Sequence, residues 1–286
     1  MKKQLPSILT IFLISTCVII AGCSVVKPVS LLNLAISSDG YALQSVRYGN
    51  QNRQAMDVYR PELASQKTPI IFIYGGAWTE GNKKDYKFIG QALSQLGHPV
   101  IIPDYRLYPD VRFPAFIQDI AQAIRFTEKN AQQLLDKPLK KFILMGHSAG
   151  AYNAALLVTK PAYLGDGLYQ KMQAVIALAG PYDLPLNDPG VKPVFAGATS
   201  ATSNILQNTH PNMPPLLLLH GQDDKRVFPF HTERWQRVLR QYGNSVEVHI
   251  YPKVNHIDVV SGIAAPLRRL SPSFQDIQQF LKRLPD

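Results

Sequence analysis

The segment Gly-His-Ser-Ala-Gly at residues 146–150 lies between an apolar run at residues 142–145 and a stretch rich in alanine. The apolar run predicts a buried strand, and the small residues after it predict the first turns of a helix. Ser148 would then occupy a strained strand-to-helix turn that exposes its hydroxyl. Such a turn needs very small residues two positions before and two positions after the serine, and Gly146 and Gly150 meet that need. The segment therefore predicts a nucleophilic serine at the end of a strand.

Short apolar runs alternate with amphipathic helical patterns from residue 41 onward. This alternation predicts a single α/β domain at residues 41–286, with a mostly parallel, doubly wound sheet covered by helices on both faces. The predicted strands are Gln54–Tyr59, Pro69–Tyr74, Pro99–Pro103, Lys141–Met145, Ala174–Ala179, Pro215–His220 and Val246–Tyr251. The predicted helices are Tyr86–Leu96, Ala115–Lys129, Ala149–Thr159, His231–Tyr242 and Ser273–Leu284.

A serine hydroxyl is a poor nucleophile at neutral pH, so it needs a histidine base that a carboxylate holds in one tautomer. In a fold of this kind the chain order is serine, acid, histidine. Asp224 follows the predicted strand that ends at His220, and His256 follows the last predicted strand. We therefore expect Asp224 to be the acid and His256 the base, and we interpret Asp223 as a turn residue. His147 is interpreted as scaffold of the serine turn and His220 as a packing residue.

Backbone N–H groups must also stabilise the negative charge that develops on the carbonyl oxygen. The segment Tyr-Gly-Gly-Ala-Trp at residues 74–78 follows a predicted strand. It resembles the His-Gly-Gly-Gly motif of lipases and esterases, with Tyr74 in place of the histidine and Ala77 in place of the last glycine. By that resemblance the oxyanion donors are the N–H groups of Gly76, Ala77 and Ala149.

Several segments together resemble bacterial esterases and lipases related to the hormone-sensitive lipase and kynurenine formamidase groups. These segments are residues 74–78, 104–107, 113–115, 146–150, 180–183 and 220–221. The resemblance covers roughly residues 54–284 and implies an α/β-hydrolase fold, a small-molecule ester substrate and no cofactor. The family histidine that Tyr74 replaces normally supports the oxyanion loop. We interpret Asp104 and Arg106 as structural residues that hold the loop after their own strand.

These residues predict a serine esterase that works through an acyl-enzyme. An aryl formamidase or amidase remains an alternative, since the related enzymes include both kinds of hydrolase. A lipid-anchored binding protein on a hydrolase scaffold is an alternative of another class, although a scaffold need not keep a complete set of nucleophile, base, acid and oxyanion donors. No histidine or cysteine spacing predicts a metal site.

A long segment between residues 183 and 212 is rich in proline, glycine, asparagine, serine and threonine. It is too long for an ordinary connection, which predicts a cap over the site. Pro185, Pro189 and Pro193 interrupt any long amphipathic helix, so we expect a short loop cap and a small pocket. Trp78 would either narrow this pocket or pack in the core. The sequence therefore predicts a preference for short acyl groups.

The first residues predict export. Two lysines precede an apolar run at residues 8–20, and the small residues before Cys23 are typical of a cleavage site, so residues 1–22 read as a signal peptide. The sequence around Cys23 resembles the lipobox of bacterial lipoproteins, which implies lipidation of that thiol and a spacer at residues 23–40. Acyl chains there would anchor the protein to a membrane. We expect the periplasmic side of the inner or outer membrane, or the cell surface.

The formal net charge is +10, but the basic residues are scattered and show no aromatic interleaving. They are interpreted as a solvated surface, and no nucleic-acid partner is expected. The one cysteine besides Cys23 is Cys17, inside the expected signal peptide. The mature domain is therefore expected to have no disulfide.

Overall fold

The computed structural model describes residues 32–33 and 36–285 of the chain. Its strands are β1 (Tyr41–Arg47), β2 (Ala55–Pro61), β3 (Ile70–Ile73), β4 (Val100–Pro103), β5 (Phe142–His147), β6 (Met172–Leu178), β7 (Leu216–Gly221) and β8 (Val246–Tyr251). They form one eight-stranded sheet in the order β1-β2-β4-β3-β5-β6-β7-β8. β2 pairs antiparallel with β1 and with β4, and the pairs from β4 to β8 are parallel. The predicted α/β-hydrolase fold with a mostly parallel sheet is confirmed.

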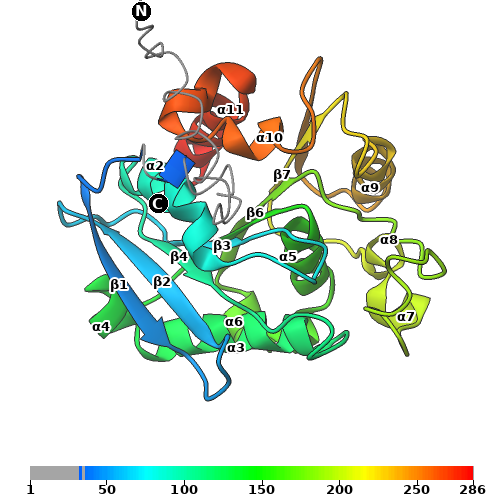
Figure 1. Ribbon diagram of the computed structural model, residues 1–286, viewed down its shortest axis with the longest axis horizontal. Helices are drawn as coiled ribbons and strands as arrows, with labels where there is room; N and C mark the ends of the chain where they lie inside the picture. The colour runs from blue at the N-terminus through cyan, green and yellow to red at the C-terminus, as the bar shows by residue number, and fades with distance from the viewer. Residues whose placement is uncertain (1–31, 34–35, 286) are drawn as a thin grey trace, which may run out of the picture.

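Helices cover both faces of this sheet. They are η2 (Lys83–Tyr86), α2 (Lys87–Ser94), α3 (Ala115–Lys129), α4 (Ala131–Leu135), α5 (Ala149–Thr159), η3 (Pro161–Tyr163), α6 (Asp166–Tyr169), α7 (Ser200–Ser203), α8 (Ile205–Asn208), α9 (Phe230–Gln241), α10 (Asp258–Ser261), η4 (Ala265–Leu270) and α11 (Ser273–Arg283). α2 and α11 lie on one side of the sheet, and α3 and α5 lie on the other (Figure 1). The long predicted helices all form, within a few residues of their expected ends.

The central strands are buried on both faces because helices cover both. Every residue of β3, β4, β5 and β7 is buried, which explains why these strands read as continuous apolar runs. Parallel strands bring their carboxyl ends to the same edge of a sheet. The loops after β3, β5, β7 and β8 therefore meet at one edge, and these loops carry the predicted site residues.

The sequence pattern missed strand β1 and the short helices. β1 lies at the edge of the sheet and pairs only with β2, joining Tyr41 to Pro61 and Arg47 to Ala55. Its burial does not alternate, since Ala42 and Leu43 are both exposed, and so its sequence has no period of two. Helices of four or five residues, such as α4 and α10, are too short to show a helical period.

The cap segment between β6 and β7 contains no long helix. Within residues 183–212 the structure forms only the four-residue helices α7 and α8, which confirms the predicted short loop cap. The residues of the expected signal peptide, Cys23 and most of the expected spacer lie outside the described residues. In the part of the chain that is described, no helix is both long enough and apolar enough to cross a bilayer.

Candidate active site

Ser148 stands on a strained turn between β5 and α5. Its backbone has φ 56° and ψ −123°, in a region that residues other than glycine rarely adopt. A Cβ atom at Gly146 would lie 2.3 Å from the carbonyl oxygen of Gly150, and one at Gly150 would lie 2.0 Å from the carbonyl oxygen of Ile73. Both positions therefore need glycine, as the sequence predicts. The backbones of the strand and the helix approach closely on either side of Ser148.

Ser148, His256 and Asp224 form a hydrogen-bonded chain. The Nε2 atom of His256 lies 2.9 Å from the Oγ atom of Ser148, and its Nδ1 atom lies 2.6 Å from Oδ2 of Asp224. A carboxylate can only accept hydrogen bonds, so the proton of the neutral imidazole is on Nδ1. Nε2 then presents its lone pair to the serine hydroxyl. This is the arrangement in which a histidine can remove a proton from a serine.

Asp224 is held as a carboxylate in a buried position. It is 1% exposed, and its Oδ1 atom accepts hydrogen bonds from the N–H groups of Arg226 and Val227, both at 2.9 Å. Burial by itself would raise the pKa of Asp224. The hydrogen bonds from His220, His256 and the Val227 amide outweigh burial and hold that pKa well below its usual range.

The neighbouring carboxylate makes no such contact with the histidine. Asp223 is exposed, and its backbone N–H donates to the carbonyl oxygen of Val254 at 3.0 Å. The structure therefore brings Asp224 to His256, as the sequence predicts, and leaves Asp223 in the turn.

The loop after β3 lies directly against Ser148. A Cβ atom at Gly75 would lie 2.8 Å from Cβ of Ser148, and one at Gly76 would lie 2.1 Å from the carbonyl oxygen of Glu80. Ala77 and Trp78 both adopt positive φ angles, 49° and 60°. The loop thus folds back tightly over the serine in a conformation that its own residues do not favour.

The predicted oxyanion donors carry unused backbone N–H groups. Those of Gly76 and Ala77 donate to no acceptor among the described residues. Ala149 is the first residue of α5, where a helix has no acceptor of its own for the N–H and where its dipole favours negative charge. Ala149 follows Ser148 directly in the chain, and Gly76 and Ala77 follow Gly75, whose added Cβ would lie 2.8 Å from Cβ of Ser148.

Two histidines make contacts that the sequence did not indicate. The Nε2 atom of His147 lies 3.0 Å from the carbonyl oxygen of His256, so it is more than scaffold for the serine turn. His220 does not merely pack: its Nε2 atom lies 2.8 Å from the carbonyl oxygen of Val227 and 3.3 Å from Oδ2 of Asp224. Both histidines support residues of the candidate triad. Their positions beside predicted site residues were the only signal in the sequence.

Asp104 and Arg106 have different partners from each other. Arg106 binds Asp119 through two side-chain hydrogen bonds of 2.8 Å, which hold the loop after β4 as expected. Asp104 instead accepts hydrogen bonds from the hydroxyl of Tyr74 and the N–H of Lys83, both at 2.7 Å. The interpretation of Asp104 as support for its own loop is therefore wrong, because its carboxylate binds both ends of the loop that follows β3.

Trp78 packs in a cluster of aromatic side chains beside the site. It is 4% exposed, and its Nε1–H donates to Oδ1 of Asn153 at 2.9 Å. Phe195 of the cap meets it edge-on at a ring distance of 4.8 Å, and Tyr152 of α5 at 5.4 Å. Tyr152 is bonded through its backbone N–H to the carbonyl oxygen of Ser148, one helical turn before it. The cluster therefore joins α5, the loop after β3 and the cap.

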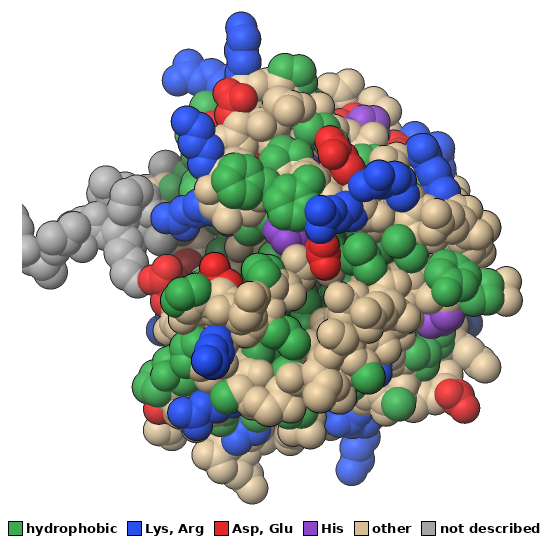
Figure 2. Space-filling model, turned by 90° about the vertical axis from the view of Figure 1, so that its right-hand side faces the viewer, with side chains coloured by type: hydrophobic (Ala, Val, Ile, Leu, Met, Phe, Trp, Pro, Cys, Tyr) green, Lys and Arg blue, Asp and Glu red, His purple; other side chains and the backbone are tan. Residues whose placement is uncertain are grey.

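Exposed hydrophobic side chains occur close to the triad. The face that carries α8 and α9 shows hydrophobic and basic side chains next to one another (Figure 2). Phe228 is 53% exposed and lies next to Val227, whose N–H binds Asp224. Ile257, which follows His256 directly, is 50% exposed. Two exposed apolar side chains thus adjoin, in the chain, residues that contact or belong to the candidate triad.

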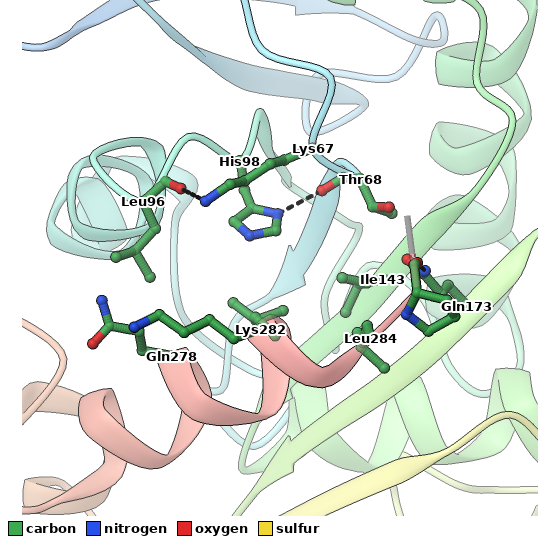
Figure 3. Close-up of a pocket in the computed structure, with 11 residues that line it drawn as sticks. Lys67, Thr68, Leu96, His98, Ile143, Gln173, Gln278, Lys282 and Leu284 are labelled. Carbon is green, nitrogen blue, oxygen red and sulfur yellow. Dashed lines mark hydrogen bonds between the residues drawn. The ribbon is translucent and has the colours of Figure 1, made fainter.

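A cavity of about 250 Å³ lies far from this site. Its lining includes Thr68, His98, Ile143 and Lys282, at the amino ends of β3 and β5 and on α11 (Figure 3). The candidate triad lies at the opposite edge of the sheet, so the cavity does not belong to the candidate active site. Among residues 32–33 and 36–285, no group of three or more histidine, cysteine or acidic side chains could hold a metal ion.

Comparisons with known proteins give consistent relatives. A family model described as BD-FAE matches residues 56–239. A probable isoprenylcysteine alpha-carbonyl methylesterase of Arabidopsis thaliana is 26% identical, over 83% of this chain and 55% of that protein. The kynurenine formamidase of Drosophila melanogaster is 22% identical, over 86% of this chain and 82% of that protein. A solved truncated carbohydrate esterase from gut microbiota matches with a TM-score of 0.71 and 22% identity, covering 86% of this chain and 97% of that chain.

The similarity covers only part of some of these relatives. The chain spans 55% of the length of the Arabidopsis methylesterase and 60% of its counterpart in Oryza sativa, less than two thirds in each case. The solved esterase shares the fold over nearly its whole length. The matched family region includes Ser148 and Asp224, and His256 follows it in the chain.

Proposed function

The chain belongs to the BD-FAE family, and on that premise we propose that it is a serine hydrolase that cleaves carboxylic esters. The observation that carries the proposal is the hydrogen-bonded chain from Ser148 through His256 to Asp224. Two relatives, a probable methylesterase and a formamidase, support hydrolysis of a carbonyl substrate.

In the proposed first half-reaction, Oγ of Ser148 attacks the ester carbonyl carbon while Nε2 of His256 takes its proton. The carbonyl oxygen becomes an oxyanion that accepts hydrogen bonds from the N–H groups of Gly76, Ala77 and Ala149. The bond from the carbonyl carbon to the alcohol oxygen then breaks. His256 returns the proton to that oxygen, and the alcohol leaves an acyl-serine behind.

In the second half-reaction, water takes the place of the alcohol. His256 removes a proton from the water as its oxygen attacks the acyl carbon, and the bond to Ser148 breaks with return of that proton to Oγ. Asp224 remains ionised throughout, because its hydrogen bonds keep its pKa low, and it stabilises the imidazolium that forms twice in the cycle.

The decisive experiment is labelling with a fluorophosphonate probe together with hydrolysis of p-nitrophenyl acetate. Ser148→Ala should lose the label and about 10⁴-fold or more of kcat. Ser273→Ala is the matched control, because this buried hydroxyl has no hydrogen-bond partner among the described residues. Full labelling of the Ser148→Ala variant would refute the assignment. A wild-type protein that neither labels nor hydrolyses any ester would favour a binding protein on a hydrolase scaffold.

We also propose that the substrates have short acyl groups. The cap has no helix long enough to form a mobile lid, and its Phe195 is buried against Trp78 beside the oxyanion loop. kcat/KM should be highest among acetate, propionate and butyrate esters of p-nitrophenol and should fall toward palmitate. The rate on tributyrin should show no jump at its solubility limit. Highest efficiency on palmitate, or a sharp rise at that limit, would identify a lipase instead.

An aryl formamidase is a second candidate, which the Drosophila relative specifically favours because the match covers 82% of that protein. The same triad can attack an amide carbonyl, so the distinction rests on the substrate. Comparing kcat/KM for N-formylkynurenine with that for p-nitrophenyl acetate decides it. A higher value for the amide would replace the esterase proposal.

The location of the enzyme is a separate proposal. The lipobox-like sequence before Cys23 supports export and lipidation, with the hydrolase domain held at a membrane on the periplasmic side or at the cell surface. The scattered positive charge of the chain would favour contact with anionic lipid heads.

A further inference from the structure

One carboxylate oxygen holds both ends of the loop that carries two of the proposed oxyanion donors. The loop runs from residue 75 to residue 82, between β3 and η2. The hydroxyl of Tyr74, just before the loop, donates to Oδ1 of Asp104 at 2.7 Å. The N–H of Lys83, just after the loop, donates to the same oxygen at 2.7 Å. The same oxygen thereby connects the two ends of the loop.

Arg53 makes a second connection across the same loop. Its Nη2 atom donates to the hydroxyl oxygen of Tyr74 at 2.8 Å and to the carbonyl oxygen of Gly81 at 2.7 Å. Its Nε atom donates to the carbonyl oxygen of Tyr105 at 2.8 Å, and the guanidinium lies 3.7 Å from Asp104. Both residues that bind the Tyr74 hydroxyl, Arg53 and Asp104, therefore also bind the far end of the loop.

The ring of Tyr74 stacks with two other tyrosine rings. The Tyr105 ring lies 4.8 Å away and the Tyr86 ring 5.6 Å away, with interplanar angles of 20° and 17°. The hydroxyl of Tyr105 also donates to the carbonyl oxygen of Tyr74 at 2.9 Å. Tyr74 is fully buried, and burial raises the pKa of its hydroxyl well above the usual value, so the hydroxyl keeps its proton and donates it.

The loop needs such support because its conformation is strained. Ala77 and Trp78 both have positive φ angles, which are unfavourable for residues other than glycine and persist only where the surrounding structure holds them. The proposed donors Gly76 and Ala77 lie two and three residues after Tyr74. A change in the position of Tyr74 would therefore move the donors first.

We infer that Tyr74, Asp104 and Arg53 form a clamp whose task is to hold the N–H groups of Gly76 and Ala77 where the oxyanion develops. Tyr74 is then a positioning residue that acts through the loop and never touches the substrate. The inference rests on the proposed hydrolase function. A clamp and ordinary core packing predict different effects of a substitution. Misplaced donors weaken binding of the transition state and leave binding of the ground state unchanged, whereas lost packing lowers stability.

The test replaces Tyr74 by phenylalanine, which keeps the stacked ring and removes only the hydroxyl. Loss of one oxyanion donor lowers kcat by about 10²–10³, so partial misplacement of two should lower it by about 10–100-fold, with KM within twofold of wild type. A short-chain trifluoromethyl ketone, which forms a tetrahedral oxyanion on serine, should bind more weakly by the same factor. The corresponding methyl ketone, which binds as a ground state, should bind as before.

Two further variants make the result specific. Tyr59→Phe is the matched control, because it removes a buried hydroxyl from β2 that has no hydrogen bond to the loop, and its kcat should be unchanged. Arg53→Lys changes a side chain that is 27% exposed, so it should fold even if the tyrosine variant does not. Its kcat should also fall about tenfold, and the double variant should lose less than the product of the two single losses.

The outcomes separate the clamp from the function. If Tyr74→Phe and Arg53→Lys keep wild-type kcat and trifluoromethyl ketone affinity while only their melting temperatures fall, the clamp is mere core packing and the inference is wrong. If both ketones weaken equally, the hydroxyl shapes the substrate pocket and the inference is also wrong. An inactive, unlabelled wild-type protein would overturn the hydrolase proposal and the clamp with it.

Discussion

The Nε2 atom of His147 lies 3.0 Å from the carbonyl oxygen of His256, so the residue before the candidate nucleophile is bonded to the candidate base. The two imidazole rings are 4.9 Å apart. Burial lowers the pKa of His147 to about 3, which keeps the ring neutral beside a histidine that must become charged during the proposed cycle. A neutral ring that donates from Nε2 can hold the loop of His256 without opposing its protonation.

Replacing His147 by phenylalanine should therefore lower kcat by about tenfold, because it removes the donor to the His256 carbonyl while filling the same space. KM should change little, since His147 is only 3% exposed. His147→Gln can still donate a hydrogen bond from its amide and should recover part of the loss. Steady-state kinetics on p-nitrophenyl acetate measure both variants. Equal activity of the phenylalanine variant and wild type would show that the contact is incidental.

Acid should destabilise the fold through its buried histidines. Burial lowers the pKa of His147 to about 3 and that of His231 to about 4, whereas both titrate near 6.5 in the unfolded chain. The unfolded state therefore binds more protons between about pH 4 and 6.5, and stability must fall as pH falls through that window. Urea unfolding from pH 7.5 to 4.5 should show this slope, and His147→Phe should reduce it. If the substitution leaves the slope unchanged, the pH dependence of the unfolding free energy comes from other groups.

Position 150 needs glycine because helix α5 lies directly against the backbone of β3 there. A Cβ atom there would lie 2.0 Å from the carbonyl oxygen of Ile73, so Gly150→Ala forces the backbone of β3 and α5 apart. We expect a loss of stability above the ~3 kcal/mol that overpacking usually produces, together with loss of activity. Gly167→Ala in α6 is the control: nothing lies within 4 Å of its added Cβ, and it should be neutral or slightly stabilising. Thermal melts compare the two, and equal stability would contradict the close approach.

The cap residue Phe195 should limit acyl length. It is 3% exposed, and its ring packs on Trp78 and on Tyr152, next to the serine helix. Phe195→Leu should open apolar space, and each substrate methylene that enters it contributes ~0.8 kcal/mol, or about fourfold in kcat/KM. The ratio of kcat/KM for the octanoate ester to that for the acetate ester should therefore rise about tenfold. Phe280→Leu in α11 is the matched control, and an equal ratio in both variants would exclude a role for the cap.

The lipid-anchor proposal predicts that Cys23→Ser moves the protein out of the membrane fraction. The thiol is the only attachment point for acyl chains that the sequence offers after the expected cleavage site. Ultracentrifugation of cell lysates, with immunodetection of both forms, measures the distribution. A variant that remains in the membrane pellet as fully as wild type would exclude lipidation as the anchor.

The sequence identified the elements that depend on neighbouring residues. The apolar runs, the helix period and the glycines around Ser148 all arise from local backbone geometry, and so the main strands, the long helices and the serine turn were predictable. Chain order then pointed to Asp224 and His256, because the fold places the loops after its parallel strands at one edge. The edge strand β1 was not predicted, because its position depends on pairing with β2 and not on its own sequence pattern.

The contacts that tune the site were decided only by the tertiary structure. His147 and His256 are 109 positions apart in the chain, and Tyr74 and Asp104 are 30 apart. Hydrogen bonds of this kind depend on which side chains the packed sheet brings within 3 Å, and a polar side chain in a sequence carries no sign of its distant partner. The sequence by itself therefore determined the fold and the candidate triad, while the folded chain decided how the base and the oxyanion loop are held.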